Sequence, residues 1–229
     1  MPVALVVGNS DGIGLALTHL LLDEGWRVVG VSRSASRITA DHYEHHVCDV
    51  RDDGYSARLG DIVSVLGELD VCVYCAGVGE FLDLETMAAE RLVFETNLLG
   101  AVATAQSVIP VMVRAGRGHF IGLSSQGDAV IDSGAPSYAA SKAGLTSYLE
   151  GLALACRRRG VSVTNLRLGF VDTKMAKAQV RPFMLSPAQA AERIRYCIRK
   201  RPMRDTFPRR MAVLLWFSGL VSSIRRRFA

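Results

Sequence analysis

Short apolar runs alternate with helix-like segments along most of the chain. The first run, Val3-Ala4-Leu5-Val6-Val7, is continuously apolar, which is typical of a strand buried on both faces of a parallel sheet. We expect strands at 3–7, 26–31, 45–48, 69–75, 119–124 and 161–168, and a short last strand around 206–207. We expect helices at 15–24, 55–66 and 135–155, a long helix or helix pair over roughly 88–115, and another helix that begins near 186. This order predicts an α/β fold: a doubly wound, parallel, seven-stranded sheet with helices on both faces.

Polar residues and glycines follow directly after most of the expected strands. They are Gly8 to Gly14, Ser32-Arg33-Ser34, Asp49-Val50, Ala76-Gly77, Ser125, and Gly169 to Thr173. Ligands of doubly wound sheets bind in the crevice beyond the carboxyl ends of the strands. The pattern therefore predicts one ligand site that draws residues from the whole chain.

The segment Gly8-Asn9-Ser10-Asp11-Gly12-Ile13-Gly14 lies between an expected strand and an expected helix. Glycines in this context let backbone N–H groups approach a pyrophosphate at a helix N-terminus. The spacing is G-x-x-x-G-x-G, not the commoner G-x-G-x-x-G. The sequence thus predicts a dinucleotide site at the first strand.

Tyr138 and Lys142 are four residues apart on an Ala- and Leu-rich helix, so they share one face. A free phenol has a pKa of roughly 10, and a nearby ammonium favours the phenolate and makes the phenol a usable general acid or base. Ser125 lies at the end of an apolar strand and offers a hydroxyl for a substrate oxygen. Alone, a Tyr and a Lys at this spacing can arise by accident.

Together, the glycine spacing, the Tyr-x-x-x-Lys pair and Ser125 thirteen residues before the tyrosine resemble the short-chain dehydrogenase/reductase family. The resemblance runs from Val3 to about Lys200 and implies a Rossmann-type domain. It also implies a catalytic tetrad of Asn97, Ser125, Tyr138 and Lys142.

In that tetrad, Tyr138 would transfer the hydroxyl proton and Ser125 would orient the carbonyl. Lys142 would lower the tyrosine pKa and bond the nicotinamide ribose, and Asn97 would place a water in the proton relay. Asp49 would hold the adenine amino group, and Thr173, with the Val171 backbone, would fix the carboxamide. The full set of expected cofactor contacts is Gly8, Ser10, Asp11, Gly12, Ile13, Gly14, Ser32, Arg33, Asp49, Val50, Ala76, Gly77, Asn97, Tyr138, Lys142, Val171 and Thr173.

Four positions depart from the family pattern. Val7 stands for the usual Thr before the first glycine, and Leu168 for the usual Pro before Gly169. Tyr74-Cys75 replaces the two asparagines that usually precede Ala-Gly, so two hydrogen-bonding side chains that brace the central strand are missing. These changes affect the expected cofactor cradle and leave every proton-transfer group in place.

The end of the second strand indicates the cofactor. An acidic residue there would bond the ribose 2′-OH of NAD, whereas an arginine accommodates the 2′-phosphate of NADP. The chain has Ser32-Arg33-Ser34 and no carboxylate, which favours NADP(H), with NAD(H) as the alternative. Asp11 argues the other way, because many NADP-using relatives carry a basic residue in that loop.

Composition is consistent with one domain of ordinary globular type: 229 residues, 49% hydrophobic and 21% charged. No signal peptide precedes the first strand, and five cysteines without a secretory context indicate reduced thiols and a cytoplasmic location. Cys72 and Cys75 match C-x-x-C but should point to opposite faces of a buried strand, so we interpret them as core residues. The histidines show no metal-ligand pattern, and no metal is expected.

The basic charge is concentrated at the C-terminus. Residues 193–229 carry 11 Lys/Arg and one acid, whereas the preceding part has a net charge of −5. We divide the chain into a domain over 1–207 and a basic, apolar helical extension over 208–229. Its apolar stretch, about a dozen residues, is too short to span a bilayer as a helix; the extension either lies at a membrane surface as a peripheral contact or packs on the fold. It lacks a groove-reading motif, so we expect no nucleic-acid partner.

The function expected from these observations is NADP(H)-dependent interconversion of a carbonyl and an alcohol on a small, hydrophobic substrate. Residues 174–185, with Met175, Phe183 and Met184, are expected to form an apolar lid. The resemblance further implies a homodimer or homotetramer. The alternative is a non-catalytic NADP sensor or membrane-associated adaptor on the same fold, although such a protein would not need Tyr138.

Overall fold

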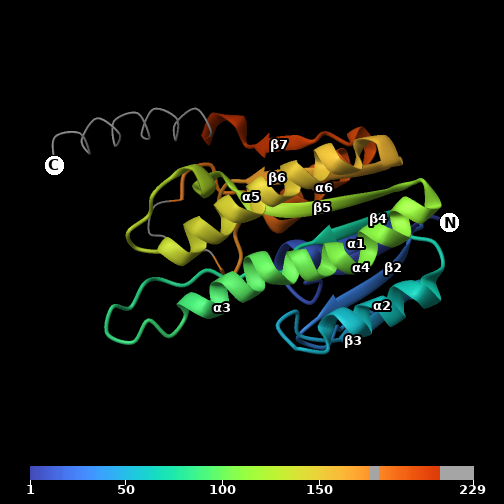
Figure 1. Ribbon diagram of the computed structural model, residues 1–229, viewed down its shortest axis with the longest axis horizontal. Coiled ribbons are helices and arrows are strands. Elements are labelled where there is room, and N and C mark those ends of the chain that lie inside the picture. The colour runs from blue at the N-terminus through green and yellow to red at the C-terminus, as the bar shows by residue number, and fades with distance from the viewer. Residues whose placement is uncertain (176–180, 212–229) are drawn as a thin grey trace.

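A computed structural model of the chain describes residues 1–175 and 181–211. It contains a seven-stranded parallel sheet in the order β3-β2-β1-β4-β5-β6-β7. The strands are β1 Val3–Val7, β2 Arg27–Ser32, β3 Tyr43–Val47, β4 Val71–Tyr74, β5 Gly118–Ser125, β6 Val161–Leu168 and β7 Arg204–Phe207. The predicted fold is confirmed, and Figure 1 shows the strands running from β3 at one edge to β7 at the other.

Helices cover both faces of this sheet. The helices are α1 Gly12–Asp23, α2 Tyr55–Leu66, α3 Glu90–Phe94, α4 Gly100–Ala115, α5 Pro136–Cys156 and α6 Pro187–Lys200. Helices α2, α4 and α5 bury Leu59, Val108 and Leu149 in the core on one face, and α1 and α6 bury Leu17 and Ile194 in the core on the other. Two apolar layers of this kind position the strand ends rigidly, which is what a ligand site at those ends requires.

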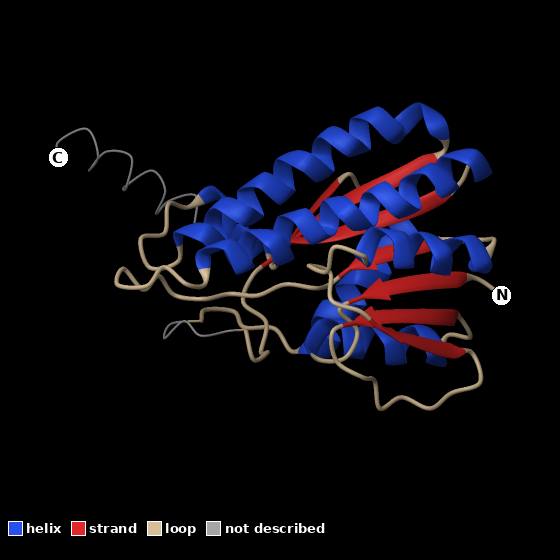
Figure 2. Cartoon of the chain, turned by 60° about the horizontal axis from the view of Figure 1, so that its bottom comes forward, coloured by secondary structure: helices blue, strands red, loops and turns tan. Residues whose placement is uncertain are grey.

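The loops that follow the strands gather at one end of the molecule. In Figure 2 the strand arrows point toward this end, where the tan loops collect. All the polar segments that the sequence places after strands therefore lie at this carboxyl edge.

The long helix or helix pair that was predicted over roughly 88–115 is two α-helices joined by a π-helical turn. The helix begins at Glu90, and residues Glu95–Leu99 form a π-helical turn (η1) between α3 and α4. The Gly100 N–H reaches back five residues to the Glu95 carbonyl, which marks one extra residue in the turn. Such π turns are frequent at functional sites because they redirect side chains. Here the turn contains Asn97.

Smaller differences concern boundaries. β2 and β3 are Arg27–Ser32 and Tyr43–Val47, against the predicted 26–31 and 45–48, and β5 extends to Ser125. Short 3-10 helices follow β5 at Gln126–Ala129 (η2) and α5 at Arg157–Arg159 (η3). The Cys72 and Cys75 side chains pack into the two opposite cores, as their spacing predicted.

By length and composition, one helical span in the described part, Glu90–Ala115, passes a test for crossing a membrane. In this fold Val93, Ala105 and Met112 of that span are buried in the core. The extension predicted over 208–229 falls almost wholly outside the described residues, which end at Met211. Its structure and any membrane contact stay predictions.

Candidate active site

The glycine-rich loop after β1 is folded tightly enough to admit only glycine at two points. A Cβ on Gly8 would lie 2.5 Å from the Ala76 N, and one on Gly14 would lie 2.1 Å from the Gly8 carbonyl oxygen. At Gly12, with φ of +54°, such an atom would meet only Thr173 Cγ2, at 3.1 Å. Backbone N–H groups in the first turn of α1 lack intrahelical acceptors, and Thr173 lies beside this turn. This cradle fits a dinucleotide pyrophosphate.

Asp11 is the N-cap of α1 and accepts a hydrogen bond from the Gly12 N–H at 2.8 Å. Its other oxygen lies 2.6 Å from Lys174 Nζ. The hydrogen bond to Lys174 is the main reason that the Asp11 pKa lies below its usual value, and the Gly12 N–H adds to the effect. The lysine, which the sequence analysis missed, thus offsets the negative charge that argued against NADP(H).

The four residues of the predicted tetrad come together around the backbone that follows β4. A Cβ placed on Gly77 would lie 3.3 Å from Asn97 Oδ1 and 3.6 Å from Lys142 Nζ. One placed on Gly79 would lie 3.6 Å from Tyr138 Cδ2, and a hydrogen bond joins Tyr138 to Ser125.

Asn97 is fully buried and connects the strand-β4 loop with helix α5. Its Oδ1 accepts from the Val78 N–H at 2.8 Å, and its Nδ2 donates to the Val78 carbonyl at 2.9 Å and to Ser141 Oγ at 3.1 Å. The side chain is therefore held in one orientation, with Ser141 as a partner that the sequence did not indicate.

Lys142 is 5% exposed, and its Nζ donates to the Leu123 carbonyl at 2.9 Å. Burial lowers the pKa of this ammonium to about 8, and the neighbouring Cys75 opposes the shift. The Nζ lies 5.9 Å from the centroid of the Tyr138 ring. The Lys142 ammonium is therefore near enough to contact a group that binds between the Lys142 and Tyr138 side chains.

The prediction that Lys142 lowers the Tyr138 pKa is wrong in this structure. Burial raises the pKa of the Tyr138 phenol, and the hydrogen bond with Ser125 opposes that rise. The physical reason is that the buried phenol loses hydration, and the nearby charge of Asp128 adds to the rise. Ser125, not Lys142, is the group that favours the phenolate here.

Tyr74, which replaces an expected asparagine, supplies a brace of its own. Its hydroxyl donates to the Thr96 carbonyl at 2.5 Å, inside the π-helical turn. A Cβ on Gly100 would lie 2.4 Å from the same hydroxyl, so the closest approach of β4 to the helix requires a glycine. The central strand is thus connected to the turn that contains Asn97, although the usual side chains are missing.

The remaining predicted cofactor residues lie at the same edge. Arg33 is exposed, Ser32 is buried, and Val171 pairs with Leu185 in an isolated bridge. Asp49 is held by Arg51, whose Nε and Nη2 donate to its two oxygens at 3.1 and 2.6 Å. This ion pair keeps the Asp49 pKa low, so the carboxylate is ionised near neutral pH. The roles assigned to these residues remain predictions.

The lid predicted over 174–185 is described only in part, because residues 176–180 lie outside the described residues. Within it, Met175 lies against the backbone of Gly77 and Gly79, with Cε and Cγ 3.2 Å from the positions their Cβ atoms would take. Phe183 and Met184 are largely exposed. Met175 therefore lies directly beside Tyr138 and Asn97.

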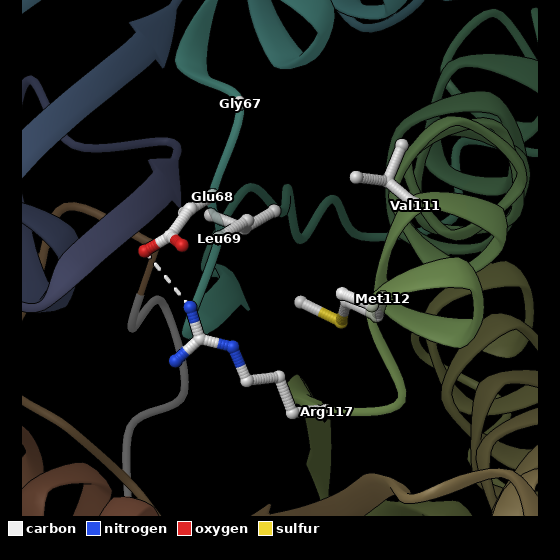
Figure 3. Close-up of a pocket in the computed structure, with 7 residues that line it drawn as sticks. Gly67, Glu68, Leu69, Val111, Met112 and Arg117 are labelled. Atoms are coloured by element: carbon white, nitrogen blue, oxygen red, sulfur yellow. Dashed lines mark ion pairs between the residues drawn. The ribbon is translucent and has the colours of Figure 1, made fainter.

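A cavity of about 260 Å³ lies at the other end of the strands, beside the segments that lead into the amino ends of β4 and β5. Figure 3 shows Leu69, Val111 and Met112 around it and the ion pair of Arg117 with Glu68. It contains none of the tetrad and is separated from the strand ends by the length of the sheet. In the described part of the chain, no group of three His, Cys, Asp or Glu side chains is arranged to hold a metal.

Comparison with known proteins defines the class. A model of the family described as short chain dehydrogenase matches residues 2–182. The chain therefore belongs to the short-chain dehydrogenase/reductase family and is an NAD(P)-dependent oxidoreductase that acts on a small molecule.

Among relatives, an uncharacterized oxidoreductase of Myxococcus xanthus is 31% identical over 92% of this chain and 88% of its own length. The 3-oxoacyl-[acyl-carrier-protein] reductase of Vibrio cholerae is 31% identical over 77% of this chain and 76% of its own. A short-chain dehydrogenase from Streptomyces avermitilis superposes with a TM-score of 0.84 at 26% identity, covering 99% of this chain and 94% of that one. An actinorhodin polyketide ketoreductase solved with NADPH gives a TM-score of 0.78 at 25% identity, covering 90% and 95%.

Proposed function

We propose that this protein uses NADP(H) to interconvert a carbonyl and an alcohol on a small hydrophobic substrate, with Tyr138 as the proton-transferring group. The observation that carries the proposal is the convergence of Asn97, Tyr138 and Lys142 on the Gly77–Gly79 backbone, next to the glycine cradle, with Ser125 hydrogen-bonded to Tyr138.

When bound, the cofactor supplies or accepts the hydride at C4 of its nicotinamide. The chain does the rest. Ser125 Oγ, which is hydrogen-bonded to Tyr138, orients the substrate oxygen, and the Tyr138 hydroxyl gives its proton to that oxygen during reduction. Lys142, fixed by the Leu123 carbonyl, places a positive charge beside the nicotinamide ribose, and the hydrogen bond from Ser125 favours the phenolate of Tyr138. Asn97 keeps the loop after β4 in place.

Three features support NADP(H) over NAD(H). Arg33 follows β2 where NAD-using proteins carry an acidic residue, the Asp11 charge is offset by Lys174, and a relative of known structure was solved with NADPH. Support for a hydrophobic substrate comes from the exposed apolar side chains on the segments after β4, β5 and β6, namely Phe81, Ile131, Phe183 and Met184.

The test is the substitution Tyr138→Phe, assayed with NADPH against a panel of lipophilic aldehydes and ketones. We expect NADPH affinity to stay within about twofold while turnover falls about 10²–10⁴-fold, the range of general acid–base catalysis. Wild-type protein that binds NADPH but turns over nothing on a broad panel would instead favour the sensor or adaptor function.

The proposed location is the cytoplasm and the proposed assembly a homodimer or homotetramer. Peripheral membrane contact through 208–229 is tested by liposome sedimentation with and without that segment. Equal partitioning of both forms would reject it.

A further inference from the structure

A chain of hydrogen bonds runs beneath the loop that follows β2. In the pairing of β2 with β3, His45 lies opposite Gly30 and Tyr43 opposite Val28, so both side chains share one face of the sheet. The His45 Nε2 lies 3.1 Å from the Ser34 carbonyl oxygen, and its Nδ1 lies 3.1 Å from the Tyr43 hydroxyl. That hydroxyl is 2.6 Å from Asn9 Nδ2.

Donor and acceptor chemistry fixes the direction of this chain. A carbonyl can only accept, so His45 Nε2 must carry a proton. In neutral imidazole the other nitrogen is then an acceptor, and the Tyr43 hydroxyl donates to it. The Tyr43 oxygen in turn accepts from the Asn9 amide. Every bond in the series from Asn9 to Ser34 is therefore satisfied when His45 is neutral.

Gly30 makes room for this arrangement. A Cβ at that position would lie 2.0 Å from Asn9 Nδ2. The Asn9 side chain thus lies directly over β2 and is fully buried, although Asn9 belongs to the glycine-rich loop. The chain therefore joins the pyrophosphate loop, Gly8 to Gly14, to the loop 32–34.

The Ser34 carbonyl is held from two sides. Besides the bond from His45, it accepts one from Ser32 Oγ at 2.8 Å. These two donors direct the Ser34 carbonyl toward the sheet. Arg33, which lies between Ser32 and Ser34 in sequence, is exposed. Arg33 lies on the side of Asp49, whose pKa is lowered mainly by Arg51 and to a smaller extent by Arg33. The loop 32–34 thus presents the Arg33 guanidinium at the carboxyl edge of the sheet, where the adenosine half of a dinucleotide would lie.

We infer that His45, supported by Tyr43 and Asn9, is a positioning residue for cofactor choice, because it holds the loop 32–34 in the conformation that offers Arg33 to a 2′-phosphate. The inference rests on the proposed NADP(H) preference and adds residues that do not touch the cofactor. It requires that loss of the His45 bond weaken binding of the 2′-phosphate and leave the rest of the adenosine site intact.

The experiment measures binding of 2′,5′-ADP and 5′-AMP, which differ only in the 2′-phosphate, by displacement of NADPH fluorescence and by calorimetry. His45→Ala should weaken 2′,5′-ADP about tenfold, as expected for loss of about 1.4 kcal/mol, and change 5′-AMP less than about twofold. His45→Gln keeps a donor that can reach the Ser34 carbonyl and should recover most of the affinity. Tyr43→Phe should give a smaller loss of the same selectivity.

His46→Ala is the matched control. His46 is the next residue of β3, lies opposite Val31 on the other face of the sheet, and pairs with Glu44 at 3.0 Å. It should leave both affinities unchanged. Equal weakening of both nucleotides by His45→Ala, or the same effect from His46→Ala, would show general disturbance of β3 and overturn the inference.

The inference and the proposed function fail in different ways. Wild-type protein that binds the two nucleotides equally would overturn the NADP(H) preference, and this inference with it. If His45→Ala keeps the wild-type preference for 2′,5′-ADP over 5′-AMP, the inference about His45 is overturned and the proposed NADP(H) preference stands.

Discussion

The close approach of Gly100 to Tyr74 gives the sharpest prediction about what supports the site. In an ordinary helix, replacing Gly with Ala stabilises by up to about 1 kcal/mol. At Gly100 the added Cβ would lie 2.4 Å from Tyr74 Oη and 2.9 Å from Val50 Cγ2. Overpacking of this kind costs about 1–3 kcal/mol, and displacing the buried Tyr74 hydroxyl from its acceptor, the Thr96 carbonyl, costs about 1–3 kcal/mol more. We expect Gly100→Ala to destabilise by about 3 kcal/mol.

The assay is thermal and urea unfolding of single and double variants. For a chain of this length the loss corresponds to a fall in Tm of about 6–12 °C. Gly151→Ala is the control, because Gly151 lies on α5 with nothing within 4 Å of its Cβ position, and we expect it to stabilise by about 0.5–1 kcal/mol.

The double variant tests the stated cause. In a Tyr74→Phe background the hydroxyl is gone, so the loss caused by Gly100→Ala should shrink by about 1–3 kcal/mol, with the contact to Val50 remaining. A Gly100→Ala protein as stable as wild type, or a loss of equal size in both backgrounds, would refute the reasoning.

Two further predictions concern charge. Burial lowers the pKa of His119 to about 3, and its Nδ1 has no hydrogen-bond partner among the described residues, so protonation is unfavourable in the folded state. The free energy of unfolding should therefore be highest above pH 6.5 and fall by about 1.4 kcal/mol for each pH unit as the pH drops toward 3. His119→Gln keeps a donor for Thr164 but does not titrate, so urea midpoints at pH 7 and 5 should differ less than in wild type, and an equal difference would contradict the assignment. Asp11→Asn keeps an acceptor for the Gly12 N–H but removes a charge beside the cradle; we expect NADPH to bind about two- to fivefold more tightly at low salt, an effect that fades at high salt, whereas weaker binding would show that the pair with Lys174 is itself needed.

The sequence by itself determined the order of strands and helices and the residues of the predicted tetrad. The order depends on local signals, such as continuous apolar runs for strands buried on two faces, whereas the tetrad is what a family resemblance implies, and fixed spacings such as Tyr138 to Lys142 carry that resemblance. Local spacing also predicted correctly that Cys72 and Cys75 pack into opposite cores.

Tertiary structure decided what each of these residues contacts. The bond from Tyr74 to Thr96 and the ion pair of Lys174 with Asp11 join segments that are distant in sequence. The Tyr138 pKa shifts opposite to the prediction because burial of the phenol, which only the fold sets, outweighs the hydrogen bond with Ser125. Spacing along a chain fixes which face a side chain occupies. Partners and burial depend on what packs against that face, and no single segment contains that information.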